Sequence, residues 1–257
     1  MIRVCSARRD RNVLGIRYRV LACDYDGTLA HAGVISAPTI AALDRFRRSG
    51  RFLLMVTGRE LPDLQNVCPV LDKFEWVVAE NGALLYRPAD NFSKLLCAPA
   101  SPQLAQKLAE AGVEPFSVGR AIIATGEPHE VLAVELIKQL GLELQVIFNK
   151  GAVMILPTGV NKATGLSAAL QRMKIAPEHV IGVGDAENDH VFLELCGVAV
   201  AVANALPMLK EHADLITRGA RGQGVIELIE RIITTGLKDV TPQARAAEVS
   251  SDTTLDR

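Results

Sequence analysis

Short runs of apolar residues recur in the first and last thirds of the chain, and most of them lead directly into polar residues. Runs that are apolar throughout are typical of strands covered on both faces, as in parallel sheets. The pattern predicts strands at residues 19–24, 52–57, 76–79, 180–183 and 198–202. These strands would form one buried parallel sheet.

Between these runs, apolar residues return at helical spacing. The first such segment opens at Ser36-Ala37-Pro38, where Ser36 can cap a helix and Pro38 suits its first turn. Further helices are predicted at residues 161–173, 187–196 and 224–235. Strands that alternate with helices predict an α/β fold, a doubly wound Rossmann-like parallel sheet with right-handed crossovers.

The middle of the chain has a different pattern. The sequence there predicts helices at residues 101–110 and 128–140, a strand at 120–125, and a hairpin of 143–148 with 152–156. We interpret this region as a smaller inserted α+β domain. The predicted organisation is an N-terminal tail (1–17), a first core part (18–86), the insertion (87–156), a second core part (157–236) and a disordered C-terminal tail (237–257).

Composition narrows the class of protein. The 257 residues carry 28 Lys+Arg and 29 Asp+Glu, so a charge of −1 gives no reason to expect nucleic acid or an acidic membrane as partner. No apolar run approaches the ~20 residues that span a bilayer. The five scattered cysteines suggest free thiols in a reducing compartment. We therefore expect a cytoplasmic protein, and leave its oligomeric state open between monomer and homodimer.

Carboxylates stand where the predicted strands end. Asp24 and Asp26 close the first strand, and Asp185 and Asp189 follow a later one. Ligands of open α/β sheets bind beyond the carboxyl ends of the strands, so these four side chains should share one edge. Carboxylates that lie close together repel one another unless a cation compensates them. Several carboxylates with waters suit Mg²⁺, which is the cofactor we predict.

The same edge has the other groups that phosphoryl transfer needs. An aspartate can act as a nucleophile, and a second carboxylate two residues on can move a proton. Thr57, at the end of the second strand, can donate a hydrogen bond to a phosphate oxygen. Lys162, at the start of a predicted helix, can supply positive charge.

The motifs around these residues resemble those of the haloacid dehalogenase-like hydrolases. DYDGTLA at 24–30 resembles their first motif, VTGR at 56–59 the second, GVNKATGL around Lys162 the third and GVGDAENDHVFL at 182–193 the fourth. The motifs occur in the family's order. The resemblance covers residues 18–86 and 155–235.

The resemblance implies a role for each acidic residue. Asp24 would be the nucleophile and a Mg²⁺ ligand, and Asp26 the general acid/base, with its backbone carbonyl on the metal. Asp185 would ligate Mg²⁺, and Asp189 would do so directly or through water.

The resemblance also implies a set of substrate-binding residues. Thr57, with Gly58 beside it, and Lys162 would hold the phosphoryl group, and Lys162 would also balance the charge of the nucleophile. Asn188 would orient the phosphate or Lys162. Arg59 would contact either the substrate or a neighbouring carboxylate.

The insertion resembles the cap of the class IIB subgroup, and Glu80-Asn81-Gly82-Ala83 resembles the stretch that precedes such caps. At about 70 residues it is nearest to the compact caps of archaeal phosphoglycolate phosphatase-like members. Within it, Arg120, Asn149 and Lys150 are candidate contacts to the leaving group.

The function that the resemblance implies is a Mg²⁺-dependent phosphatase. It would hydrolyse a small phosphorylated metabolite, phosphoglycolate or a sugar phosphate, through an aspartyl-phosphate. Two alternatives stay open: a phosphotransferase or phosphomutase with the same site, and a regulatory module of the same fold.

Overall fold

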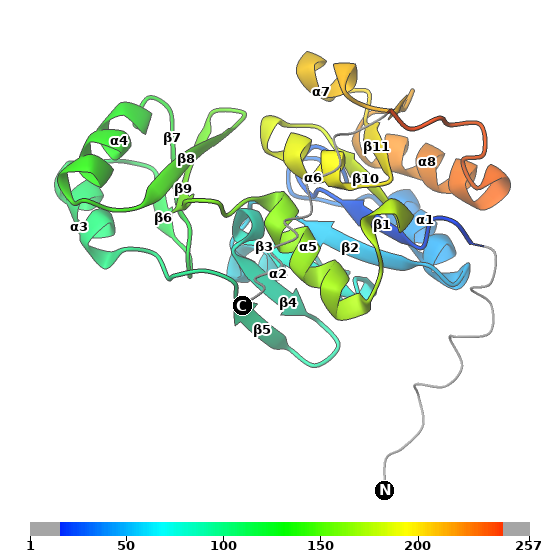
Figure 1. Ribbon diagram of the computed structural model, residues 1–257, viewed down its shortest axis with the longest axis horizontal. Coiled ribbons are helices and arrows are strands. Elements are labelled where there is room, and N and C mark those ends of the chain that lie inside the picture. The colour runs from blue at the N-terminus through cyan, green and yellow to red at the C-terminus, as the bar shows by residue number, and fades with distance from the viewer. Residues whose placement is uncertain (1–15, 244–257) are drawn as a thin grey trace, which may run out of the picture.

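Two β-sheets organise the chain in the computed structural model, which describes residues 16–243 (Figure 1). The strands of the larger, core sheet are β1 (Val20–Cys23), β2 (Phe52–Val56), β3 (Trp76–Ala79), β4 (Leu84–Arg87), β5 (Phe92–Leu95), β10 (Val180–Gly184), β11 (Val198–Ala201) and β12 (Leu215–Ile216). Their order across the sheet is β12-β11-β10-β1-β2-β3-β4-β5. The strands from β12 to β3 are parallel, and β4 and β5 are antiparallel additions at one edge.

Helices cover both faces of the core sheet, which confirms the α/β prediction. The helices are α1 (Ala37–Arg48), α2 (Leu61–Val67), α5 (Lys162–Met173), α6 (His190–Leu195), α7 (Pro207–Glu211) and α8 (Arg221–Thr235). Helices α5 and α6 pack together on one face, and α1 and α8 pack together on the other (Figure 1). Every residue of β1 and β3 is buried, as the continuous apolar runs predict.

Four short 3₁₀ segments complete the core: η1 (Leu71–Lys73), η2 (Glu80–Gly82), η3 (Pro177–His179) and η4 (Glu187–Asp189). Segments η2 and η4 follow β3 and β10, at the carboxyl edge of the sheet. Helix α1 begins where the sequence predicts, because the hydroxyl of Ser36 accepts the backbone N–H of Thr39.

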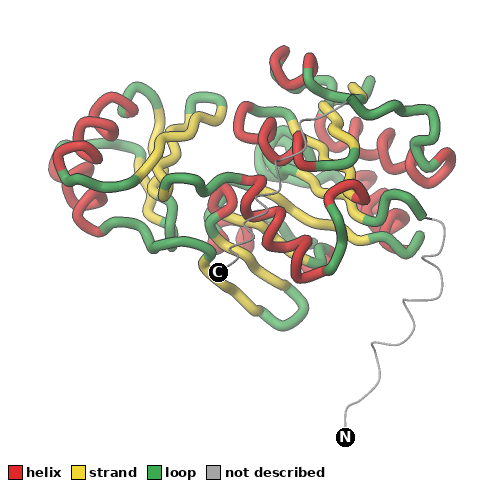
Figure 2. Tube along the Cα trace, viewed as in Figure 1, coloured by secondary structure: helices red, strands yellow, loops and turns green. Residues whose placement is uncertain are grey.

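The inserted cap domain has a sheet of its own. It contains α3 (Pro102–Glu110), β6 (Phe116–Val118), β7 (Ile123–Gly126), α4 (Glu130–Gln139), β8 (Leu144–Asn149) and β9 (Ala152–Pro157), with the antiparallel strand order β6-β7-β9-β8. Figure 2 shows these strands as a separate group beside the core strands. Leu108 and Ile137 from its helices join one apolar cluster, while Ile122 and Met154 join Ala83 of the core in another. One face of the cap sheet therefore turns to its helices and the other to the core.

The structure differs from the sequence-based boundary between core and cap. The chain does not leave the core sheet after Tyr86, because β5 pairs with β4 in an antiparallel hairpin. Strand β5 reads FSKL, with two exposed polar residues, so it lacks the apolar run that marks the other strands. Its register comes instead from pairing at the sheet edge and from the edge-on contact of Phe92 with Trp76.

The predicted C-terminal tail also begins too early. Leu237 is fully buried and Val240 nearly so, and both belong to the main apolar cluster. The expectation of disorder from residue 237 is therefore wrong as far as residue 243. The rest of that tail and the arginine-rich residues 1–15 lie outside the described residues.

No helix within residues 16–243 is both long and apolar enough to cross a membrane. In the same part of the chain, Cys23, Cys68, Cys97 and Cys196 form no disulfide. Cys5 lies outside the described residues.

Candidate active site

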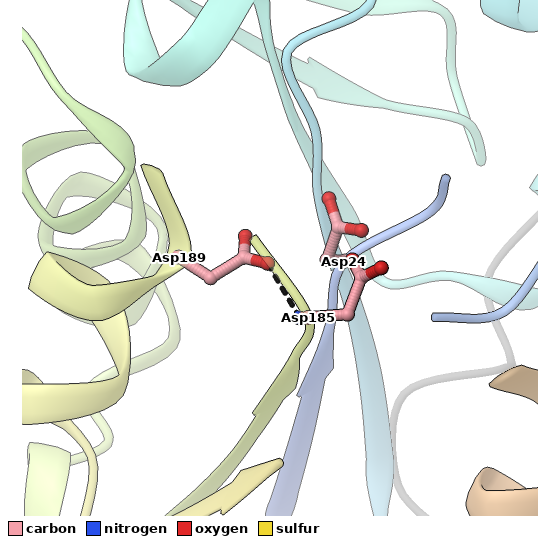
Figure 3. Close-up of side chains that lie close together, drawn as sticks. All are labelled: Asp24, Asp185 and Asp189. Carbon is pink, nitrogen blue, oxygen red and sulfur yellow. Dashed lines mark hydrogen bonds between the residues drawn. The ribbon is translucent and has the colours of Figure 1, made fainter. Parts of the chain in front are cut away.

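Three carboxylates meet at the carboxyl edge of the core sheet (Figure 3). Asp24 directly follows β1, Asp185 directly follows β10 and Asp189 ends η4. Strands β1 and β10 are parallel neighbours, with Cys23 opposite Val183, so Asp24 comes level with Gly184, the residue just before Asp185. One oxygen from each carboxylate lies within 4.8 Å of the others, and all three side chains are buried.

Lys162 supplies a buried positive charge to this group. Its ammonium donates to Asp24 Oδ1 at 2.7 Å and to Asp189 Oδ1 at 2.5 Å. Burial by itself lowers the pKa of Lys162, but Asp189 and Asp24 outweigh that effect and raise the pKa above its usual value. The lysine is therefore held in its charged form.

Local sequence explains how Lys162 reaches this position. Asn161 caps helix α5, and its side-chain oxygen accepts the backbone N–H groups of Ala163 and Thr164 at 3.0 and 3.1 Å. Lys162 is thereby fixed as the first residue of the helix, pointing into the carboxylate group. Thr164 completes the cap, because its hydroxyl accepts the backbone N–H of Asn161.

Negative charge is in excess around Asp24. Burial raises the pKa of Asp24 well above its ordinary value, the charge of Asp189 raises it further, and Lys162 offsets only part of the effect. Asp24 Oδ2 is buried and has no hydrogen-bond partner among the described residues. A compact group of buried carboxylates with one unpartnered oxygen fits a hard divalent cation, for which oxygen ligands are preferred.

Asp185 accepts side-chain contacts on both oxygens. Thr28 donates to its Oδ1 at 3.2 Å, Asn204 donates to its Oδ2 at 3.1 Å, and the ammonium of Lys150 also reaches Oδ2. Burial raises the pKa of Asp185, and the hydrogen bond from Lys150 opposes that rise.

Asp189 has both oxygens engaged. Its Oδ2 accepts the backbone N–H of Asp185 at 2.8 Å, the dashed line in Figure 3. The same oxygen accepts the backbone N–H of Ala186 at 2.9 Å, and Oδ1 accepts a hydrogen bond from Lys162. Asp189 therefore shapes the loop that carries Asp185. Asp24, whose Oδ2 has no partner among the described residues, is better placed to ligate a cation directly.

The turn after the first strand closes onto Asp185. Gly27 has a φ of +82°, and a Cβ there would lie 2.1 Å from Asp185 Oδ2. The carbonyl of Gly27 accepts a 2.8 Å hydrogen bond from Asn204. Only glycine lets the backbone approach the carboxylate this closely.

Asp26 lies apart from the three carboxylates. Its side chain is 43% exposed and accepts two hydrogen bonds from Arg59, at 2.6 Å from Nε and 2.8 Å from Nη2. Arg59 also pairs with Asp63. Of the two contacts expected for Arg59, the structure has the one to a neighbouring carboxylate.

The remaining predicted residues lie close to where the core meets the cap. Thr57 is buried, and its hydroxyl accepts the backbone N–H of Arg59 at 3.1 Å. Met154 of the cap lies against Gly58, where a Cβ would come within 2.6 Å of Met154 Cε. Asn188 donates to Asn81 Oδ1 at 2.9 Å rather than to Lys162.

Sequence reasoning missed several contributors to the site. Asn204 comes shortly after the apolar run of β11, so the rule that singled out Asp24 and Asp185 could have found it. Thr28 and Asn81 stand inside stretches that resemble family motifs, but only the fold shows their partners, Asp185 and Asn188.

Comparison with known proteins decides the family. A model described as haloacid dehalogenase-like hydrolase matches residues 21–118 and 122–229. The chain belongs to the haloacid dehalogenase-like hydrolases. The matched spans contain both segments that supply the carboxylates, so the resemblance drawn from the four motifs is confirmed.

Similar curated proteins place the chain among the phosphatases of that family. Phosphoglycolate phosphatase 2 of Saccharolobus solfataricus is 30% identical, over 86% of this chain and 94% of its own. Phosphoglycolate phosphatase of Methanothermobacter thermautotrophicus is also 30% identical, over 84% of this chain and 99% of its own. The chain is accordingly an enzyme, a phosphoric monoester hydrolase, as predicted.

Solved structures share the fold of core and cap. A haloacid dehalogenase-like hydrolase from Bacteroides thetaiotaomicron has a TM-score of 0.72 at 21% identity, covering 84% of this chain and 99% of its own. A structure described as a subclass IIB sugar phosphatase has a TM-score of 0.68 at 17% identity, covering 83% of this chain and 98% of its own. The cap is thus of the predicted IIB-like type.

Proposed function

We propose that this chain is a Mg²⁺-dependent phosphatase that hydrolyses phosphoglycolate or a sugar phosphate through an aspartyl-phosphate on Asp24. The observation that carries the proposal is the buried Lys162–Asp24 pair, set among three carboxylates with Asp24 Oδ2 unpartnered. The names of the similar phosphoglycolate phosphatases support the substrate class.

Asp24 and Asp185 would hold the Mg²⁺ ion, with Asp189 ligating directly or through water and Asp26 through its backbone carbonyl. When bound, the ion would offset the excess negative charge and stabilise charge on the transferred phosphoryl group. Lys162 and Thr57 would hold the phosphoryl oxygens. A hydroxyl that already accepts one hydrogen bond, like that of Thr57, still has its own proton to donate.

In the first step, an oxygen of Asp24 attacks phosphorus in line with the leaving oxygen. The bond from phosphorus to that oxygen breaks, and Asp26 gives its proton to the departing alcohol. Asp26 is 43% exposed, so its carboxyl is accessible to a bound substrate. Arg59 would orient this carboxyl through its two hydrogen bonds.

In the second step, Asp26 takes a proton from a water molecule, whose oxygen attacks the phosphorus of the aspartyl-phosphate. The bond from phosphorus to Asp24 breaks, which releases phosphate and restores the carboxylate. The cap would exclude other water during the first step and contact the leaving group.

The test is phosphate release from 2-phosphoglycolate and a panel of sugar phosphates, with Mg²⁺ and with EDTA. We expect turnover with Mg²⁺ only, and a loss of at least about 10³-fold in Asp24→Asn, because the amide is a poor nucleophile. Asp72→Asn, which changes an exposed carboxylate in η1, is the matched control and should retain turnover.

A second readout separates chemistry from folding. Acid-quenched wild-type enzyme should carry a phosphoryl group on Asp24, detected as a peptide mass increase, and Asp24→Asn should carry none. Mg²⁺-dependent turnover that persists undiminished in a folded Asp24→Asn enzyme would rule out Asp24 as the nucleophile.

A further inference from the structure

The cap places one lysine against the candidate metal site. Lys150 stands at the tip of the β8–β9 hairpin, in the left-handed region with a φ of +48°. Its ammonium reaches Asp185 Oδ2, and its backbone N–H donates to the carboxylate of Glu187 at 3.2 Å. Two contacts to the loop after β10 therefore hold the hairpin tip over the carboxylates.

Most of the cap face in this region is apolar. Ile147 and Ala124 are each opposite Met154 in the cap sheet, and residues directly opposite share a face. Ala152 lies two residues before Met154 on the same strand, so it lies on that face too. These residues belong to the apolar cluster that faces the core. Ser117, opposite Ala124, and Asn149, opposite Ala152, add neutral polar groups to this face, and Lys150 at its end adds a positive charge.

Asn149 shares this face but carries no charge, and the two arginine candidates are engaged by other residues. Arg120 donates from Nη1 to Ser93 Oγ at 3.0 Å, at the edge of the core sheet. Asn149 pairs with Ala152 in the ladder of the cap sheet. Arg59, on the core side, is engaged by Asp26 and Asp63.

We propose that Lys150 selects substrates whose leaving group carries a carboxylate or similar anion close to the phosphate ester. This inference rests on the proposed function. A divalent cation held by Asp24 and Asp185 would repel the ammonium from Asp185, because like charges at contact distance disfavour each other. Lys150 is 38% exposed, so its ammonium can turn to an anion in the space under the cap. The ammonium thus leaves the carboxylate of Asp185 and pairs with the carboxylate of the substrate.

The test compares two small esters that differ in charge. The first is 2-phosphoglycolate, and the second is 2-hydroxyethyl phosphate, in which a hydroxymethyl group replaces the carboxylate. Lys150→Met should lower kcat/KM for 2-phosphoglycolate about 10- to 100-fold, the effect of one lost charge-assisted hydrogen bond, and change kcat/KM for the neutral ester less than about threefold. Lys150→Arg, which keeps the charge, should restore most of the loss.

Lys174→Met is the matched control. Lys174 is exposed and also left-handed, with a φ of +54°, but it lies at the C-terminal end of α5. The Lys174→Met substitution should leave kcat/KM for both esters unchanged. Calorimetric titration with Mg²⁺ gives a readout that needs no turnover: Lys150→Met should bind Mg²⁺ several-fold more tightly, because Asp185 loses a competing cation, and Lys174→Met should not.

Three outcomes would overturn the role of Lys150: equal loss on both esters, no loss on either, or unchanged Mg²⁺ affinity. If the wild type with Mg²⁺ hydrolyses neither these esters nor any sugar phosphate, the proposed function itself fails, and the role of Lys150 fails with it.

Discussion

At the scale of single residues, the site depends on how closely the backbone approaches the carboxylates. Gly27 brings the turn after β1 against Asp185, whose two oxygens accept hydrogen bonds from Thr28 and Asn204. Asp189 uses one oxygen to hold the loop around Asp185 and the other to hold Lys162. A displaced carboxylate would therefore disturb both the cation site and the loops that form it.

Gly27→Ala tests this close approach. The new Cβ would overlap Asp185 Oδ2 and push that carboxylate away, so we expect kcat/KM to fall about 100-fold and Mg²⁺ binding to weaken. Alanine is also strained at the positive φ of this position, which should lower the free energy of unfolding by about 1–2 kcal/mol. Steady-state kinetics and calorimetric Mg²⁺ titration give the two measurements.

Gly50→Ala is the control for strain alone. Gly50 has a φ of +85°, nearly that of Gly27, but nothing lies within 4 Å of its added Cβ. The Gly50→Ala variant should lose a similar amount of stability and keep its activity. Equal activity in the two variants would show that the contact with Asp185 is unimportant.

At the scale of elements, helix α5 determines where the buried charge lies. Its cap, Asn161, satisfies two backbone N–H groups of the first turn, and Lys162 is the first helical residue. The backbone of Asn161 also packs on η2, where a Cβ on Gly82 would lie 1.9 Å from the Asn161 carbonyl oxygen. The start of α5 is thus held by its own cap and by the segment after β3.

Asn161→Ala tests whether the cap positions Lys162. The loss of a helix cap should lower the free energy of unfolding by about 1 kcal/mol, as measured by urea denaturation. We expect kcat/KM to fall about tenfold as well, because the first turn that carries Lys162 loosens.

Ser36→Ala removes a comparable cap from α1, a helix that carries none of the site residues. It should cost similar stability with little change in kcat/KM. An equal drop in kcat/KM for both variants would mean that Asn161 acts through general stability.

At the scale of the whole molecule, a buried carboxylate connects core and cap. Glu80, in η2 just after β3, is fully buried and has a φ of +50°. Its side chain accepts the backbone N–H groups of Arg120, Ala121 and Ile122, at 3.1, 2.8 and 3.2 Å. These hydrogen bonds add a non-covalent link to the chain segments that join the domains.

Glu80→Gln should weaken this link, because an amide NH₂ group cannot accept the N–H that one carboxylate oxygen accepted. We expect a loss of about 1–3 kcal/mol in the free energy of unfolding and faster hydrogen exchange at residues 120–122. Hydrogen-exchange mass spectrometry and urea denaturation measure these effects. Glu135→Gln, an exposed change on α4, should alter neither. Unchanged protection at 120–122 in Glu80→Gln would contradict the proposed link.

The sequence by itself determined five strands of the core sheet, the longer helices beside it and the segments that supply the site. Continuous apolar runs mark strands buried on both faces, and the polar residues after them, such as Asp24 and Asp185, mark the edge where parallel strands end. These signals are local, because the pattern of neighbouring residues shows both the burial of a strand and the period of a helix. For that reason the fold class and the hairpin of β8 with β9 were predictable, whereas β5, a polar edge strand, was not.

Only the tertiary structure decided how residues far apart in the chain pair with one another. Arg59 faces Asp26 rather than open space, Lys150 reaches Asp185 from the cap, and Glu80 accepts N–H groups from the loop before β7. Each contact depends on the relative position of two packed elements, and residue type alone leaves several partners open to a charged side chain. The carboxylates could be placed from the sequence because strand ends share an edge. Apart from Lys162, their partners could not, because Thr28 and Asn204 reach Asp185 from other loops of the core and Lys150 reaches it from the cap.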